Sequence, residues 1–432
     1  MKSLRPIELL VAVALAGAVV LAPTNGAVLM SLVVIQAAAA MIRSPLALFA
    51  FALMVPVSPY PIFGVPALAW AVAAGWFAVG CRRAALRGRR PLDRRQKVAL
   101  VLAAGVLISA TAHGVSNAFA WWIVLELALL PLAFALLAEL WEPTQMRRCI
   151  AWFGCGLAVA AGQSLRDLLA VRAANIEQFL QTRHLVALAG GSNYVAAILT
   201  VCGLFFVAVA IARGRLAWAS AALGAACLLA PFIVASRASF VGLVAGMGVL
   251  VVLRRKTLGG SRRRWVAAAL CLLLLVGVFS QTGEFLRSRL RLVAEVGLAE
   301  RGPLFQASAD IFRDNPVDGV GPGNVRGELA ERQLFFESSY SHNIVLSLLG
   351  QLGALLGGLY LWLLWPFRSW VLKNEILAPM LVAGFVISLG EVGVESVRMG
   401  LLYALSLSGA AAAGAVQRGA APKPLAVSAG VR

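Results

Sequence analysis

The chain has 432 residues, of which 61% are hydrophobic and only 13% are charged, and its formal net charge is +19. Soluble domains carry about 25% charged residues, so this composition excludes a soluble globular protein and predicts a polytopic membrane protein. The basic residues do not indicate nucleic-acid binding, because they cluster in short loops between apolar segments, eight of them in 82–97 and six in 254–264. That placement is typical of cytoplasmic loops, which face anionic lipid.

Apolar segments recur along the whole chain. The hydrocarbon core of a bilayer is about 30 Å thick and needs roughly 20 apolar residues per helix. Because several of the segments are shorter than that, we expect about 12–14 transmembrane helices in an all-α bundle. The candidate spans are 7–22, 26–42, 45–57, 64–80, 98–112, 119–141, 149–163, 191–212, 216–235, 238–253, 265–281, 343–365, 376–394 and 399–416.

The basic loops fix the predicted orientation. With the amino terminus in the cytoplasm, every basic loop and the carboxyl tail, 418–432, fall on the cytoplasmic side. Two polar segments then face outside, a smaller one at 164–190 and a large insert at 282–342. We therefore divide the chain into an amino-terminal transmembrane bundle (1–281), the insert, carboxy-terminal transmembrane helices (343–417) and the tail.

The insert cannot lie in a membrane, since its 61 positions hold nine acidic residues and seven arginines. Pro303 suits the first turn of a helix with apolar residues on one face, and Asn315-Pro316 ends that helix. The glycine-rich loop 319–324 follows, and a second amphipathic stretch starts at Val325. We expect two short helices that lie over the membrane surface as a lid above a cavity.

His342 ends the insert and is one of three histidines in the chain. Ser341 is a candidate cap for the following helix, which would place His342 in its first turn, where the helix dipole disfavours an imidazolium. A neutral histidine can accept a proton, so His342 is a candidate general base. The alternative is a hydrogen-bonded, inert histidine at the membrane boundary.

Arg237 lies between two apolar segments, with almost no loop into which its charge can escape. An arginine at mid-membrane depth costs about 2.5–3.5 kcal/mol on insertion scales, so such a residue is usually kept for a partner. A planar guanidinium suits a phosphate, whereas snorkelling to outside water is the alternative. Arg301 is a surface arginine of the insert, and composition leaves its role undecided.

Other polar residues support weaker hypotheses. The glycine-rich loop either holds an anion with its backbone amides or is an ordinary turn. The arginines of the smaller outside segment give it a positive face, which is either a phosphate site or a solvated surface; they are Arg166, Arg172 and Arg183. Glu391, Glu395 and Arg398 indicate an intramembrane ion pair, which a proton-coupled transporter would also have.

The remaining reactive side chains give no further motif. His113 and His184 have no triad-like neighbours, and we expect both to be structural. The six cysteines fall in predicted spans or at their cytoplasmic ends, where small apolar packing residues are expected. No metal-ligand spacing and no nucleotide-binding motif is present in the sequence.

Three stretches occur in a recognisable order: Ser236 to Ser239, Arg301 through Asp314-Asn315-Pro316 to Asn324, and Ser341-His342-Asn343. With the many spans and a long outside loop near three-quarters of the chain, they resemble the O-antigen ligase and polymerase family of bacterial membrane glycosyltransferases. The resemblance covers residues 230–360, and the amino-terminal half agrees only in hydropathy.

The resemblance implies a GT-C-like glycosyltransferase of the bacterial inner membrane, with a periplasmic active site and both termini in the cytoplasm. Its donor would be an O-antigen glycan on undecaprenyl diphosphate and its acceptor lipid A–core, with no metal or other cofactor. His342 would be the catalytic base, and Arg237 and Arg301 would bind the diphosphate. Substrate contacts would come from Arg166, Arg172, Arg183, Asn193, Gly321, Gly323, Asn324 and Asn343.

Several activities fit this pattern. Within the family, a ligase moves the glycan to lipid A–core, a polymerase extends the glycan, and a protein O-oligosaccharyltransferase moves it to serine or threonine. Overall size and the compact insert favour the ligase. A lipid-linked glycan transporter is the alternative from another class; such proteins are usually built from inverted repeats, and the sequence shows none.

Overall fold

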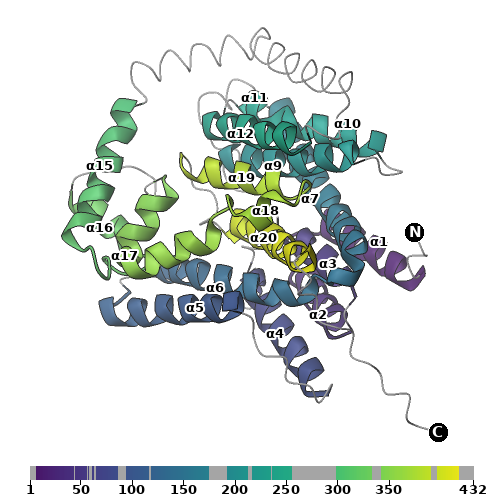
Figure 1. Ribbon diagram of the computed structural model, residues 1–432, viewed down its shortest axis with the longest axis horizontal. Coiled ribbons are helices and arrows are strands. Elements are labelled where there is room, and N and C mark those ends of the chain that lie inside the picture. Colours follow the sequence, from purple (N-terminus) through teal and green to yellow (C-terminus); the bar gives the residue numbers. More distant parts are fainter. Residues whose placement is uncertain are drawn as a thin grey trace.

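A computed structural model gives the fold of the chain (Figure 1). It describes residues 6–42, 44–55, 57, 61–62, 65–85, 94–115, 118–174, 192–212, 217–234, 236–254, 298–332, 342–390 and 397–417. In this part of the chain every regular element is a helix except one short strand pair. The antiparallel strands β1 (Pro61–Ile62) and β2 (Val65–Pro66) pair Pro61 with Pro66 and Ile62 with Val65.

The helices of the amino-terminal bundle are α1 (Pro6–Leu21), α2 (Gly26–Met41), α3 (Leu46–Met54), α4 (Ala67–Ala85), α5 (Arg94–His113), α6 (Ala118–Leu140), the 3-10 turn η1 (Pro143–Gln145), α7 (Met146–Ala174), α9 (Ser192–Ile211), α10 (Ala217–Leu228), α11 (Ala230–Val234) and α12 (Arg237–Arg254). The insert contains α15 (Leu298–Asp314) and α16 (Val325–Glu331). The closing helices are α17 (Ile344–Leu364), α18 (Ser369–Leu372), α19 (Ala378–Ser388) and α20 (Val397–Gln417).

Six stretches of the described chain are long and apolar enough to cross a membrane: Gln96–His113, Ala120–Leu140, Asn193–Ile211, Ala217–Val234, Arg237–Arg254 and Ile344–Leu372. Four shorter apolar helices add to them: Pro6–Leu21, Gly26–Met41, Ala378–Ser388 and Met399–Gly414. Every predicted span overlaps at least one helix, except 265–281, which lies outside the described residues, as does the last part of 376–394. The predicted all-α polytopic membrane fold is therefore confirmed.

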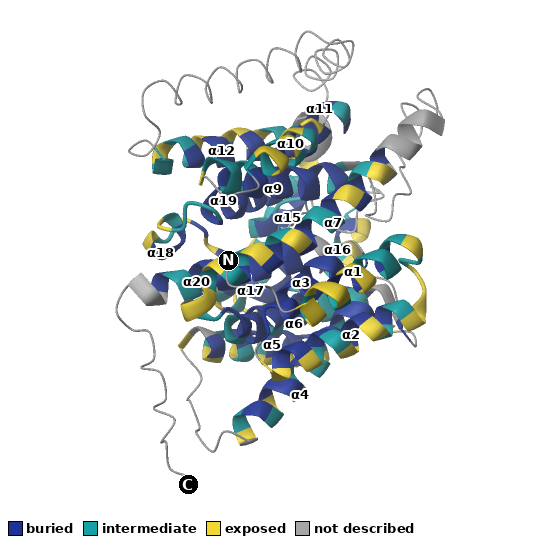
Figure 2. Cartoon of the chain, turned by 90° about the vertical axis from the view of Figure 1, so that its right-hand side faces the viewer, coloured by how far each residue is buried: buried dark blue, intermediate teal, exposed yellow. Residues whose placement is uncertain are grey.

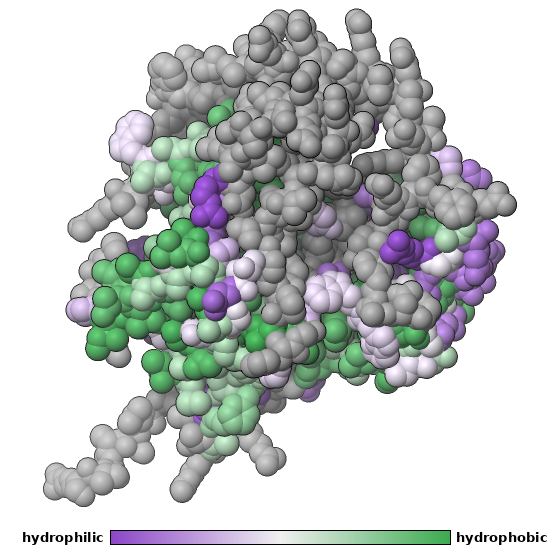
Figure 3. All heavy atoms as spheres, turned by 180° about the vertical axis from the view of Figure 1, so that it is seen from behind, coloured by the Kyte–Doolittle hydropathy of each residue, from purple (hydrophilic) through white to green (hydrophobic). Residues whose placement is uncertain are grey.

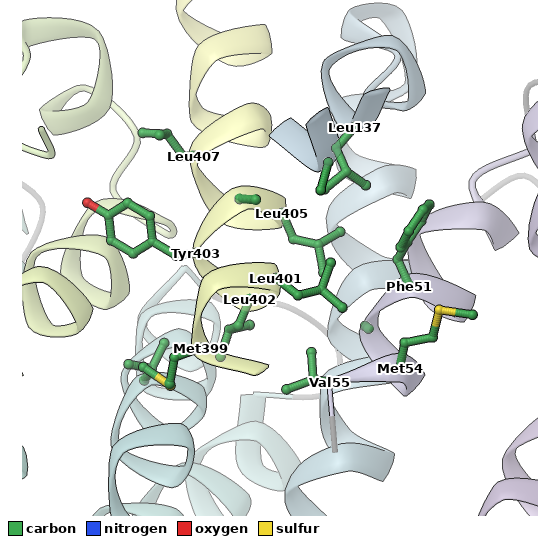
Figure 4. Packing of buried hydrophobic residues seen from close by; sticks show 14 of the residues in the cluster. Phe51, Met54, Val55, Leu137, Met399, Leu401, Leu402, Tyr403, Leu405 and Leu407 are labelled. Atoms are coloured by element: carbon green, nitrogen blue, oxygen red, sulfur yellow. The ribbon is translucent and has the colours of Figure 1, made fainter. Parts of the chain in front are cut away.

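The core lies where α3, α6 and α20 meet. Figure 4 shows Leu401 and Leu405 of α20 on the side that faces Leu137 of α6 and Phe51 of α3, and all four side chains are at most 1% exposed. Every residue of α3 is buried, and α9 is also mostly dark blue at the centre of Figure 2. The middle of the bundle is thus closed by apolar packing.

A proline in α6 is matched by a tyrosine on α17. Pro131 has no N–H, so the carbonyl of Leu127, four residues earlier, loses its helical partner. The hydroxyl of Tyr360, which is 1% exposed, donates to that oxygen at 2.9 Å. This bond satisfies a buried polar group and connects α6 to α17.

Charged side chains cluster at the end of the bundle farthest from α15 and α16. Arg82 donates to Ala40 O at 2.9 Å and, together with Arg83, pairs with Glu139, which also accepts from Gln96 Nε2 at 2.7 Å. Two more ion pairs at this end are Arg148–Glu8 at 2.5 Å and Arg254–Glu375 at 2.8 Å. Buried arginines of this kind are stable because they are paired.

The opposite end, which we call the insert end, carries α15 and α16 beside α17 (Figure 1). Seen from behind, hydrophilic residues gather over this end, at the right of Figure 3, and hydrophobic residues dominate the described surface at the left. The apolar face of α15 predicted from the sequence is present: Leu304, Ala307, Ser308 and Ile311 are buried. Leu304, Ala307 and Ile311 pack with Val325 and Leu329 of α16.

Candidate active site

The insert joins α17 through His342 and Asn343. Asn343 is the N-cap of α17, and its Oδ1 accepts hydrogen bonds from Val345 N at 3.0 Å and Leu346 N at 3.2 Å. His342 therefore precedes the cap, whereas the sequence predicted it in the first turn of the helix. The predicted cap, Ser341, lies outside the described residues. His342 has a φ of 51°, in the left-handed region, and is partly exposed at the insert end.

Arg237 is the first residue of α12, at a sharp turn after α11. Ser236 N donates to Pro231 O at 3.0 Å, which closes the turn, and Ser236 Oγ donates to Ser239 Oγ at 2.9 Å across the first turn of α12. Arg237 is partly exposed. Its guanidinium and the positive end of the α12 dipole lie at one place, and both favour an anion.

The carboxyl end of α19 links these two helix starts. Asn343 Nδ2 donates to Leu389 O at 3.1 Å, one residue beyond the end of α19. A Cβ on the next residue, Gly390, would lie 3.8 Å from the Cβ of Ala238, the neighbour of Arg237. The structure therefore brings the helix starts that carry His342 and Arg237 to the insert end, on either side of the end of α19.

The glycine-rich loop is hydrogen-bonded to α17 at a kink in that helix. Gly353, inside α17, has φ 68° and ψ −175°, which interrupts the helix. The carbonyls on the amino-terminal side of the kink accept bonds from the loop, Gly350 O from Val320 N at 2.9 Å and Gln351 O from Gly321 N at 3.1 Å. The loop backbone thus completes the hydrogen bonding of a broken helix.

Two further bonds hold the same junction. Ala354 N, just past the kink, donates to Pro316 O at 2.8 Å. The side chain of Gln351, which is 3% exposed, accepts from Gly323 N at 2.9 Å and donates from Nε2 to Ser347 Oγ at 3.0 Å. The amides of the loop that were candidates for an anion cradle therefore bond to the protein itself, and the loop is a structural junction.

The loop glycines are required by backbone conformation and by space. Gly321 and Gly323 have φ values of 89° and 86°, where other residues are strained. A Cβ on Gly321 would lie 2.6 Å from His113 Cβ, and one on Gly323 would lie 2.6 Å from Ala120 O. Gly321 and Gly323 therefore allow the loop to pack directly on the ends of α5 and α6.

Asn324 ties the loop to α5 as well. Its Nδ2 donates to Gly114 O at 3.1 Å and to Val320 O at 3.0 Å. The amide nitrogen of Asn324 thus bonds within the protein, and the predicted substrate contact at this residue stays a prediction. Because α15, the loop and α16 are fixed to α5, α6 and α17, this part of the insert is a rigid cap on the bundle. The sequence predicted these two helices as a lid above a cavity.

Arg301 lies near the start of α15, which begins at Leu298, five residues before Pro303. The sequence prediction started this helix near Pro303, but Pro303 lies inside it. The side chain of Arg301 is outside the described part of the structure. The helix α15 packs on α17, where a Cβ on Gly350 would lie 3.6 Å from Ile311 Cγ2.

The predicted residues of the smaller outside segment are spread over two helices. Arg166 is exposed on α7, and its Nη1 donates to Val20 O at 3.4 Å. Because α7 continues to Ala174, the first part of this segment is helix; it includes Arg172, whose side chain is not described. Asn193 is the second residue of α9, partly exposed. Arg183 lies outside the described residues, as do the side chains of Glu391, Glu395 and Arg398.

Two residues at the insert end had no sequence signal. Gln351 reads as an ordinary polar residue of an apolar span. His113, expected to be structural, contacts the loop: its Nδ1 lies 2.9 Å from Ser109 O, and its Nε2 lies 3.3 Å from Asp318 Oδ2. The contacts that hold the junction, from Gln351 to Gly323 and from His113 to Asp318, join residues far apart in the sequence, and no local pattern could have identified them.

Residues 225–361 match the family model described as O-Antigen ligase. Over this segment the chain is similar to the O-antigen ligase family. The matched residues run from α10 through Arg237 and the insert to residue 361 of α17. They therefore contain His342, Arg301 and the contact of the loop 319–324 with the α17 kink at Gly353, which we call the loop–kink junction. No curated protein is significantly similar to the chain.

Similarity to the O-antigen ligase family gives the chemistry in broad terms. The family implies an enzyme of the glycosyltransferase type whose substrates are in general terms a lipid-linked glycan and lipid A–core. The helices that are long and apolar enough to cross a membrane agree with a multi-pass membrane protein.

Proposed function

We propose that this protein is an O-antigen ligase of the bacterial inner membrane. It moves the O-antigen glycan from undecaprenyl diphosphate to a sugar hydroxyl of lipid A–core, with the insert end in the periplasm and both termini in the cytoplasm. The observation that carries the proposal is the common position of His342 and Arg237 at the insert end, joined through the end of α19.

The arginines act on the leaving group. As the bond between the anomeric carbon and the diphosphate oxygen breaks, its electron pair stays on the diphosphate, and negative charge grows there. Arg237, at the positive end of α12, and Arg301, near the start of α15, stabilise that charge. Removal of one such group typically costs about 10²–10³ in rate.

His342 acts on the acceptor. The imidazole takes the proton of the acceptor hydroxyl while the oxygen attacks the anomeric carbon, a step that contributes about 10²–10⁴-fold. A single displacement inverts the configuration at that carbon. The bond formed is the new glycosidic bond, the bond broken is the one to the diphosphate, and the proton ends on His342.

The rigid cap supports this reaction by holding catalytic groups in fixed positions. With α15, the loop and α16 fixed to three helices of the bundle, the backbone that carries Arg301 is proposed to keep its place when substrates exchange. Fixed catalytic groups lower the barrier because less order has to be created in the transition state. We propose that the long acceptor and donor glycans extend away from the membrane past this cap.

The test is transfer by the purified protein, reconstituted with lipid-linked O-antigen and lipid A–core. Wild type is compared with His342→Ala and Arg237→Ala, and with Arg313→Ala as a matched arginine control. Arg313 lies on the same insert end, is 74% exposed and pairs with Asp310 at 2.8 Å. We expect losses of about 10²-fold or more in the first two variants and near-normal transfer in the control.

Other outcomes would redefine the activity. If wild type ignores lipid A–core but lengthens the donor glycan, the protein is a polymerase with the same site, and transfer to a serine or threonine would make it a protein O-oligosaccharyltransferase. If it only moves the lipid-linked glycan across the bilayer, it is a transporter. Full activity of His342→Ala would show that the base is another group.

A further inference from the structure

The hydrogen bonds of the Asn343 side chain indicate two functions, one for the oxygen and one for the nitrogen. Oδ1 accepts from Val345 N and Leu346 N and caps α17. Nδ2 donates to Leu389 O at 3.1 Å, on a different helix. Capping requires only the oxygen, so the amide nitrogen serves a separate purpose.

That second bond ends on a rigid pair of helices. α19 packs directly on α12, since a Cβ on Gly242 would lie 2.9 Å from Ala383 O and one on Gly246 would lie 2.8 Å from Pro379 O. Such close backbone contact leaves little room for one helix to slide along the other. The carboxyl end of α19 therefore moves with α12, whose first residue is Arg237.

We propose that Asn343 is a positioning residue that fixes the separation between His342 and Arg237. Its cap orders the start of α17 immediately after His342, and its bond to Leu389 O fastens that start to the helix pair carrying Arg237. Asn343 would act through these two residues, without touching the substrate. This inference rests on the proposed function for its effect on rate, but its geometric part does not.

Two substitutions separate the functions of the side chain. Asn343→Asp and Asn343→Ser both keep an oxygen that can cap α17, and both lose the amide donor to Leu389 O. Asn25 offers a matched control, because its Oδ1 caps α2 with the same pair of bonds, from Ala27 N at 2.9 Å and Val28 N at 3.3 Å. Asn25→Asp makes the same chemical change at another helix start.

The first readout is steady-state transfer. We expect both Asn343 variants to lose at least about 10-fold in kcat with KM for donor and acceptor within about threefold, and Asn25→Asp to match wild type, because small misplacement of reacting groups costs rate. A raised KM with unchanged kcat would overturn the proposal in favour of a substrate contact. A loss in Asn343→Asp alone would also overturn it, in favour of repulsion between the new carboxylate and the diphosphate.

The second readout does not depend on activity. Spin labels at Val241→Cys on α12 and Val345→Cys on α17, in a background free of other cysteines, report the separation of the two helix starts. We expect a broader distance distribution in both Asn343 variants and an unchanged one in Asn25→Asp. If the distribution stays narrow in all of them, Asn343 does not hold the helices. If wild type transfers no glycan, the proposed function fails and this measurement alone decides the role of Asn343.

Discussion

His342 holds a backbone conformation that few side chains tolerate. Its φ of 51° lies in the left-handed region, where asparagine is several-fold enriched and alanine is not. The bend lets the chain leave the insert and enter α17 through the cap at Asn343. The catalytic proposal and the fold therefore make separate demands on one residue.

These demands can be separated with His342→Asn. Asparagine suits the left-handed backbone but is no general base, so we predict unchanged thermal stability together with a loss of about 10²–10⁴-fold in transfer. Thermal unfolding of the purified variants and the transfer assay give the two quantities. Retained transfer in this variant would show that the imidazole is dispensable.

The residues proposed for catalysis could be found from the sequence, but their supports could not. His342, Arg237 and Arg301 stand out as polar residues in an apolar context or within a family motif. Gln351 and Leu389 O, by contrast, matter through bonds to residues that are close only in the folded chain. Asn343 is predicted from the sequence as a substrate contact, and its bonds to Leu389 O and to the start of α17 were not predictable from one short motif.

Substitution of two nearby glycines, one in the loop and one in α16, should change the free energy of unfolding by very different amounts. Gly323→Ala would force a left-handed alanine against Ala120 O, so we predict a loss of more than about 2 kcal/mol. Gly327→Ala in α16 is the control, because position 327 is helical and no atom lies within 4 Å of a Cβ placed there. We expect this substitution to be neutral or to stabilise the protein by up to about 1 kcal/mol. Apparent melting temperatures of both variants in the same detergent test this; equal melting would contradict it.

The bond from Tyr360 to Leu127 O should be needed only because Pro131 is present. We predict that Tyr360→Phe destabilises the bundle by about 0.6 kcal/mol, and by up to about 1.7 kcal/mol, the range seen for hydrogen bonds between membrane helices. In a Pro131→Ala background the residue at 131 regains an N–H for Leu127 O, so the same substitution should cost less.

A double-mutant cycle measures this dependence. Unfolding free energies of the two single variants and the double variant give the coupling between positions 131 and 360. A coupling of zero would mean that the tyrosine hydroxyl does not compensate for the proline.

Element positions were more predictable than element ends. The apolar segments located nearly every described helix, because membrane thickness fixes length and composition together. The ends differed where local rules were overruled: α15 continues through the region ahead of Pro303, and α7 extends into a segment expected to be loop. The rigid attachment of the insert was missed because it depends on a kink within α17, and one glycine in an apolar span gives no sign of a kink.

At the scale of the whole molecule, charge divides the two ends of the bundle. Paired arginines lie at the end opposite the insert, as the positive-inside rule predicts for a cytoplasmic face. In a background without other cysteines, we predict that a membrane-impermeant maleimide labels Arg313→Cys in intact spheroplasts. Lys97→Cys, exposed at the start of α5, should be labelled only after the membrane is permeabilised. The reverse pattern would invert the proposed orientation.

The loop–kink junction at Gly353 also limits which segments can be swapped between homologous proteins in a chimera. The segment from α15 to α16 shares hydrogen bonds with α17 on both sides of the kink and packs on the ends of α5 and α6. A chimera that swaps only this segment would leave Gly350 O, Gln351 O and Ala354 N facing a foreign backbone. The smallest segment that can be swapped therefore runs from the start of α15 past Gly353. Any substrate specificity that the insert carries can thus be transferred only together with about half of α17.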